Sequence, residues 1–357
     1  MVVLHLGSMS AAALRRGGMC RAVARTLART LARTVAHTVV RGHVKASDPS
    51  QPQAGFTLTE LLVVLLLAGG IVSGALHIAV SLLQANQQDM TQARVSGDLL
   101  RSLNYVADDL RQAVYVYDGS CLGQGQGAVP QGGCPGLANH LPTGLMPERE
   151  RYPVLAFWRL SPLSQSLQQQ CRQGRLPASA CQSQHSYTLV VYAVSTLDNS
   201  DIWQGEARLQ RYTLNKFRQS GEATLGYVDP SRFNHQFHTW PWYHRSGSAA
   251  IANQQQGRPS LRGNAPVPLV DFIDFSVQQP DQGASCPEGY RPTAAAKVLA
   301  RLDSVLGCVG GTANQQHVLV MLRGQLPAAS RSRPSAQQPR IQTQVFTRSQ
   351  LHYLPPD

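Results

Sequence analysis

A continuous apolar run dominates the N-terminal part of the chain. Residues 61–83 read LLVVLLLAGGIVSGALHIAVSLL and contain no Lys, Arg, Asp or Glu. About 20 apolar residues suffice to cross a bilayer as a helix. The run passes directly into a polar segment, without the small-residue cleavage site that ends a secretory signal peptide. We therefore predict a retained transmembrane helix.

This helix is expected to extend beyond the apolar run, because no proline occurs between Pro52 and Pro130. It is predicted to run from about Phe56 to about Val116. In its second half, apolar residues recur at spacings of three and four, which is typical of an amphipathic helix. They are Val95, Leu99, Leu103, Val106, Leu110 and Val114.

The remainder of the chain is predicted to be rich in strands. After Tyr117 the composition shifts to Gly, Gln and Pro between short β-branched and aromatic runs. The candidate strands are residues 154–160, 187–196, 207–214, 267–277, 317–322 and 341–346. The Gln-rich segment 163–184 is expected to be a loop. We predict an α+β fold in which the amphipathic half of the helix packs on one face of an antiparallel sheet.

Charge and cysteine content indicate the compartment. Eight basic residues and one acidic residue in residues 1–55 account for +7 of the formal charge of +12, which leaves +5 for the rest. Basic residues before a membrane helix favour a cytoplasmic N-terminus and a periplasmic or extracellular bulk. The scattered +5 forms no basic stripe, which argues against nucleic-acid binding.

Without Cys20 the chain has six cysteines, an even number that suits disulfides in an oxidising compartment. Six cysteines allow fifteen pairings. Pairing between neighbours in the sequence is the simplest hypothesis. It gives Cys121–Cys134, Cys171–Cys181 and Cys286–Cys308.

A short motif, GFTLTELLVV, precedes the apolar run and places the carboxylate of Glu60 at its edge. This motif resembles the processing site of type IV prepilins. The resemblance implies cleavage between Gly55 and Phe56 by a prepilin peptidase, and N-methylation at Phe56. It also implies an assembly role for Glu60, paired with the N-terminal amine of a neighbouring subunit, since each group is costly alone in lipid. An ordinary single-pass anchor with an incidental glutamate is the alternative.

Within this family, the segments SGDLLRSLNYVADDLRQAVYVYDG and VLAFWRL resemble minor pilins of the PilW kind and type II J-pseudopilins. The chain looks closest to the cyanobacterial pseudopilins of hormogonium polysaccharide secretion. The strong motif covers residues 55–83, and the weaker similarity extends to about residue 160.

The resemblance divides the chain into four segments. Residues 1–55 would be a leader, residues 56–83 the transmembrane half of a pilin-like helix, residues 84–117 its amphipathic half, and residues 118–357 a globular β-rich domain. Residues 24–39 repeat with a period of four and place arginines on one helical face. They are interpreted as a disposable extension, or as residues before a later translation start, rather than as a membrane-surface helix.

Catalytic patterns are absent from the sequence, which contains no GxSxG, HExxH, Walker loop or zinc spacing. Asp108 and Asp109 are adjacent on the predicted helix and point in different directions, which predicts a solvated face rather than an acid/base pair. We expect no enzymatic activity, no cofactor and no metal.

An aromatic and histidine-rich stretch, residues 233–245, offers a weak candidate for a ligand patch. Trp240, Trp242 and Tyr243 could stack on sugar rings. His235, His238 and His244 could instead bind a metal, although no carboxylate or cysteine lies among them. Packing of the aromatic rings under a loop is the favoured interpretation.

The expected function is mechanical, namely that of a minor pilin or pseudopilin of a type IV pilus or a type II secretion-like system. It would serve polysaccharide secretion or motility. The expected partners are the prepilin peptidase, other pilins or pseudopilins and an inner-membrane assembly platform. The alternative is a membrane-anchored glycan- or DNA-binding module displayed on a pilin-like helix.

Overall fold

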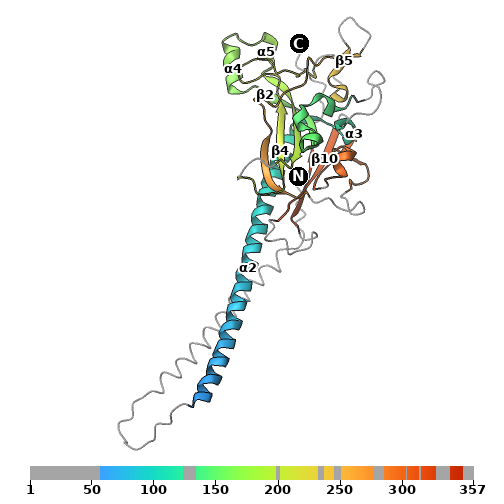
Figure 1. Cartoon of the computed structure of the whole chain (residues 1–357). Coiled ribbons are helices and arrows are strands. Elements are labelled where there is room, and N and C mark those ends of the chain that lie inside the picture. Colours follow the sequence, from blue (N-terminus) through green and yellow to red (C-terminus); the bar gives the residue numbers. More distant parts are fainter. Residues whose placement is uncertain are drawn as a thin grey trace, which may run out of the picture. The chain divides into compact units, whose positions relative to one another are not determined.

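The structure is a computed structural model, and it describes residues 57–123, 134–197, 202–231, 237–244, 251–275, 285–302, 304–312, 315–326 and 338–348. The chain divides into two parts, residues 1–76 and 77–357. A 54-residue helix, α2 (Leu58–Arg111), begins in the first part and ends in the second (Figure 1). The predicted α+β class is confirmed.

The first sheet has five strands in the order β1-β2-β3-β4-β7, all antiparallel. Its strands are β1 (Ala113–Val116), β2 (Arg151–Pro162), β3 (His185–Ser195), β4 (Ala207–Leu214) and β7 (Val267–Ile273). The predicted end of the helix was wrong by several residues. The segment AVYV leaves the helix after Arg111 and pairs with β2, since its β-branched and aromatic side chains favour a strand.

The second sheet has four antiparallel strands in the order β11-β10-β9-β8. They are β8 (Tyr290–Pro292), β9 (Val305–Thr312), β10 (Gln315–Arg323) and β11 (Arg340–Phe346). A small hairpin joins β5 (Trp242–His244) to β6 (Ile251–Asn253). The prediction of one sheet was therefore incomplete, because the strands divide between two larger sheets and this hairpin.

Short helices connect the strands. They are α3 (Gly119–Leu122), η2 (Leu137–His140), η3 (Thr143–Leu145), η4 (Pro147–Arg149), α4 (Gln165–Arg172), α5 (Ala178–Ser183), η5 (Phe237–Thr239) and α6 (Ala296–Leu299). The segment 163–184, predicted as a loop, contains α4 and α5. Ser164 caps α4, because its hydroxyl accepts from the Leu167 amide.

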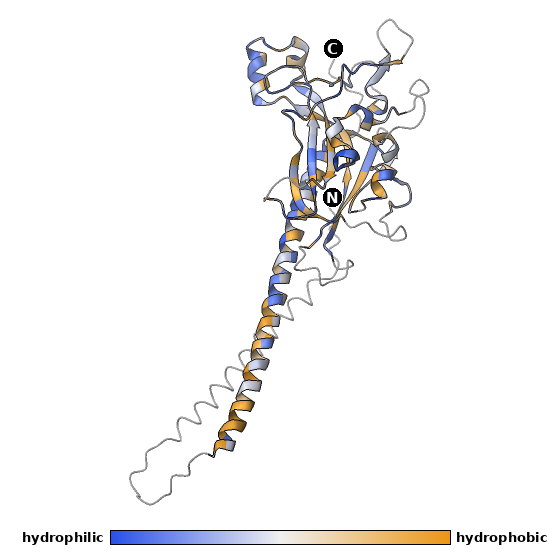
Figure 2. Ribbon diagram, viewed as in Figure 1, coloured by the Kyte–Doolittle hydropathy of each residue, from blue (hydrophilic) through white to orange (hydrophobic). Residues whose placement is uncertain are grey.

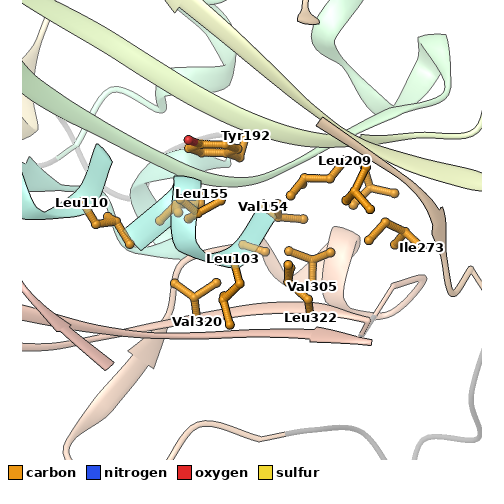
Figure 3. Close-up of a cluster of buried hydrophobic side chains, with 14 of the residues drawn as sticks. Leu103, Leu110, Val154, Leu155, Tyr192, Leu209, Ile273, Val305, Val320 and Leu322 are labelled. Atoms are coloured by element: carbon orange, nitrogen blue, oxygen red, sulfur yellow. The ribbon is translucent and has the colours of Figure 1, made fainter. Parts of the chain in front are cut away.

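The main core lies between the two larger sheets, with the second half of α2 inside it. Leu99, Leu103 and Leu110 of α2 are at most 2% exposed. Figure 3 shows Leu103 between β2 side chains on one side and Val320 and Leu322 of β10 on the other. The helix therefore stabilises both sheets at once. A second cluster, around Trp158, lies on the face of the first sheet that α2 does not cover.

The three predicted disulfides are present, joining Cys121 to Cys134, Cys171 to Cys181 and Cys286 to Cys308. Each closes a local loop, and each lies in the second part of the chain. Disulfides persist in oxidising compartments. The pairing therefore agrees with an extracytoplasmic location for this part.

Candidate functional site

The first half of α2 is apolar and uncovered. Its large side chains between Leu58 and Leu83 are 51–81% exposed, in contrast to the buried leucines of the second half. Figure 2 shows this change, with the early turns of α2 coloured as hydrophobic. Within the described residues α2 is the one helix long and apolar enough to cross a membrane. The N-terminal helix and the disulfides indicate a single-pass membrane or secreted protein.

Glu60 lies in the first turn of this apolar segment. Its backbone amide donates to the carbonyl of Thr57 at 3.0 Å and lies 3.4 Å from the Thr57 hydroxyl, which places Thr57 at the helix start. No ion pair to the Glu60 carboxylate forms within the described residues. Gly55 and Phe56, the predicted processing residues, lie outside the described residues.

The second half of α2 is fixed to the first sheet by a buried carboxylate, that of Asp109. Arg159 of β2 donates to one of its oxygens at 2.5 Å, and Arg211 of β4 donates to the other at 2.7 Å. Tyr192 of β3 also donates to it, at 2.7 Å. The Asp109 side chain is 6% exposed. Three neighbouring strands therefore converge on one residue of the helix.

Burial and the Asp109 carboxylate together shift the pKa values of Tyr192 and Arg211. Burial, and after it the Asp109 charge, raise the pKa of Tyr192, so the phenol stays protonated and donates its hydrogen bond. Burial opposes the charge of Arg211, but the hydrogen bond and charge of Asp109 outweigh it and raise the pKa of Arg211. Arg211 therefore keeps its charge beside the carboxylate.

The prediction of a solvated face at Asp108 and Asp109 was wrong for Asp109. Asp108 is 69% exposed and pairs with Arg111 one turn later. Asp109 lies seven residues after the buried Ser102, so both occupy the flank of the apolar stripe that faces the sheet. This seven-residue spacing is the feature of the sequence that could have predicted a sheet-facing Asp109.

The aromatic residues of the candidate ligand patch are largely inside the protein. Trp240 and Tyr243 are 1% and 3% exposed and belong to the second core cluster. The Trp240 ring lies edge to face with Trp158, and its indole donates to the Val228 carbonyl. Trp242 is half-buried. Packing, the favoured interpretation, matches these positions for Trp240 and Tyr243.

Trp242 contacts a buried histidine. Its indole Nε1 donates to Nε2 of His140 at 3.3 Å, and His140 Nδ1 lies 3.0 Å from the Gln255 side-chain oxygen. Burial lowers the pKa of His140, although the hydrogen bond that its ring makes to the Gln255 side-chain oxygen opposes this shift. The neutral ring, with Nε2 as acceptor, therefore fits this position. His235, from the alternative metal hypothesis, lies outside the described residues.

Within the described residues, no group of three His, Cys, Asp or Glu side chains could hold a metal ion. No family model, curated protein or solved structure matches the chain. The long apolar N-terminal helix, packed against antiparallel sheets by its second half, is consistent with a pilin-like fold.

Asp109→Asn is expected to lower the free energy of unfolding by about 3 kcal/mol, because it leaves two largely buried arginines without their counter-charge. The matched control is Asp108→Asn, one residue away and exposed, which should cost less than about 0.5 kcal/mol. Urea unfolding of the full chain in detergent measures both. Equal, small effects would show that the buried carboxylate does not hold the helix.

His140 should make stability depend on pH. Its pKa is lower in the folded protein than in the unfolded chain, so the unfolded chain binds the proton first. Stability is therefore expected to fall as pH drops below about 6.5, the ordinary histidine value. His140→Gln retains a hydrogen-bond acceptor and should lose that component. Urea midpoints at pH 7.5 and 5.5 measure it, and identical pH dependence in both proteins would contradict the assignment.

Proposed function

We propose that the protein is a non-enzymatic subunit of a membrane-anchored filament, a minor pilin or pseudopilin. The observation that carries the proposal is the division of α2. One half is buried between the sheets of its own chain, and the other half exposes apolar side chains around its whole circumference. Such a surface needs a lipid bilayer, the helices of other subunits, or each in turn.

The first half of α2 is apolar on every face, which favours burial on all sides, in a bilayer or among the helices of other subunits. A helix that only packs on its own domain has an apolar stripe and a polar opposite face. In contrast, residues 61–83 contain no charged side chain on any face. Gly69, Gly70 and Gly74 have no heavy atom of this chain near the position of an added Cβ. Small residues on an apolar helix let another helix approach closely, which supports packing against other subunits.

Glu60 supports the same proposal. A carboxylate at the edge of the hydrocarbon region costs free energy, on the order of 3 kcal/mol at a helix centre and less near an end. A partner from another subunit would offset that cost. The resemblance to prepilins suggests the amine at Phe56 of a neighbour, freed by cleavage after Gly55. A charge-assisted pair of this kind would also set the axial register between subunits.

In this proposal the N-terminus is cytoplasmic and the globular part lies outside the inner membrane, as the basic residues before the helix favour. The prepilin peptidase, other pilins or pseudopilins and an assembly platform would be its partners. A displayed glycan-binding module is the second candidate function. A polar cleft in the globular part, whose lining includes Arg159, Arg218 and Arg262, favours it.

The Glu60 pairing can be tested by cross-linking in native membranes. A tagged full chain carrying Glu60→Gln should give about tenfold less cross-linked product with neighbouring subunits. Loss of about 1.4 kcal/mol from the ion pair between subunits has that effect. The control is Glu148→Gln, which removes an exposed acid from η4. Intact mass should show equal processing of both variants. Cross-linking of Glu60→Gln at the wild-type level would contradict the proposed pair.

A further inference from the structure

A polar cleft of about 610 Å³ opens at one end of the first sheet. Its floor belongs to the face that α2 covers farther along, where Arg159 pairs across the strands with Thr188, and Ser161 with Ser186. The helix ends at Arg111, so this part of the face is left uncovered by α2. The walls come from the start of α4, from residues 215–225 and from residues 260–264. Ligand pockets typically have volumes of 300–1,000 Å³.

The charge of the cleft is of one sign. Its lining contains three arginines and no acidic residue. Arg159 is held by Asp109, but Arg218 is 53% exposed and lies 3.9 Å from Glu222, itself 72% exposed. Arg262 is exposed and makes no ion pair within the part of the chain that the structure describes. Planar guanidinium groups bind carboxylates with two parallel hydrogen bonds. The cleft therefore favours an anionic ligand.

Hydroxyl and amide groups supply most of the remaining lining. They belong to Ser161, Ser164, Ser186, Thr188, Asn215, Gln219, Ser220, Thr224, Ser260 and Asn264. Such groups match the hydroxyls of a sugar. A peptide would need a free strand edge or apolar anchor pockets. Along the cleft β2 and β3 pair with each other alone, because β1 reaches β2 only as far as Arg159 and β4 reaches β3 only as far as Leu189. The preference for a sugar therefore rests on the hydroxyl and amide lining, and a glutamate oligopeptide serves as the competing probe in the test.

The walls are held in place before any ligand arrives. The disulfide between Cys171 and Cys181 joins α4 to α5. Leu163, Leu167 and Phe217 pack beneath them in a small core. The Gln170 side chain also donates to the Gln219 carbonyl at 2.9 Å, which links α4 to the opposite wall. A prearranged site loses less entropy on binding.

We propose that this cleft binds a carboxylated oligosaccharide, with Arg218 and Arg262 contacting the carboxylate groups and the serines, threonines and amides contacting the ring hydroxyls. The ligand would lie at the end of the sheet beyond the last turn of α2. This inference is independent of the filament proposal, because a chain that fails to assemble would still contain the cleft.

Binding can be measured on the full chain in detergent by titration calorimetry. The probes are an oligogalacturonate, a neutral oligosaccharide of equal length, a glutamate oligopeptide and inorganic sulfate. The double variant Arg218→Gln/Arg262→Gln should bind the oligogalacturonate at least about tenfold more weakly. The matched double control, Arg101→Gln/Arg149→Gln, removes two exposed guanidinium groups outside the cleft. Thermal midpoints should show that both variants remain folded.

The proposal requires that the wild-type chain and the control bind the oligogalacturonate equally well, and bind the neutral sugar at least about tenfold more weakly. Equal losses in both double variants would reduce the effect to overall charge and overturn the site. Binding of sulfate or of the glutamate peptide as tightly as the oligogalacturonate would overturn the assignment to a sugar. Undetectable binding of every probe would overturn the proposal as a whole.

Discussion

The hydrogen bonds and ion pairs of the Asp109 carboxylate hold α2 on the first sheet, and the packing of the two sheets around the helix depends on them. The carboxylate lies on a helix between two sheets and receives hydrogen bonds from three adjacent strands of one of them. Apolar packing along α2 is not directional, whereas this cluster fixes both the position and the rotation of the helix on the sheet. The second half of α2 is held in this way, whereas its first half is left uncovered by the described residues of the chain.

Much of the fold could be predicted from the sequence, because its elements have strong local patterns. The uncharged run and the three-and-four spacing predict α2, and β4 was predicted with its observed bounds. Strand β9 was missed, since its sequence VLGCVGGT is rich in glycine and lacks a β-type alternation. The division into two sheets was also missed. It depends on contacts between segments distant in the sequence, which no local pattern specifies.

The candidate site was predictable only in part, for the same reason. The motif around Glu60 is continuous in the sequence, and the disulfides join neighbouring cysteines. In contrast, the partners of Asp109 lie 50, 83 and 102 residues away, at Arg159, Tyr192 and Arg211. The cleft likewise gathers residues from four separate segments. The aromatic residues of segment 233–245 suggested a weak ligand patch that included Trp240, but the Trp240 ring is buried.

The central proposal is that α2 lies at the processed N-terminus of a filament subunit. Intact mass and N-terminal fragment analysis of the membrane-extracted protein, compared with a Gly55→Ala variant, tests it most directly. We predict a mature chain that starts at methylated Phe56 in the wild type, and an uncut chain in the variant. A wild-type chain that still carries the residues before Phe56 would contradict it and would leave α2 as an ordinary membrane anchor.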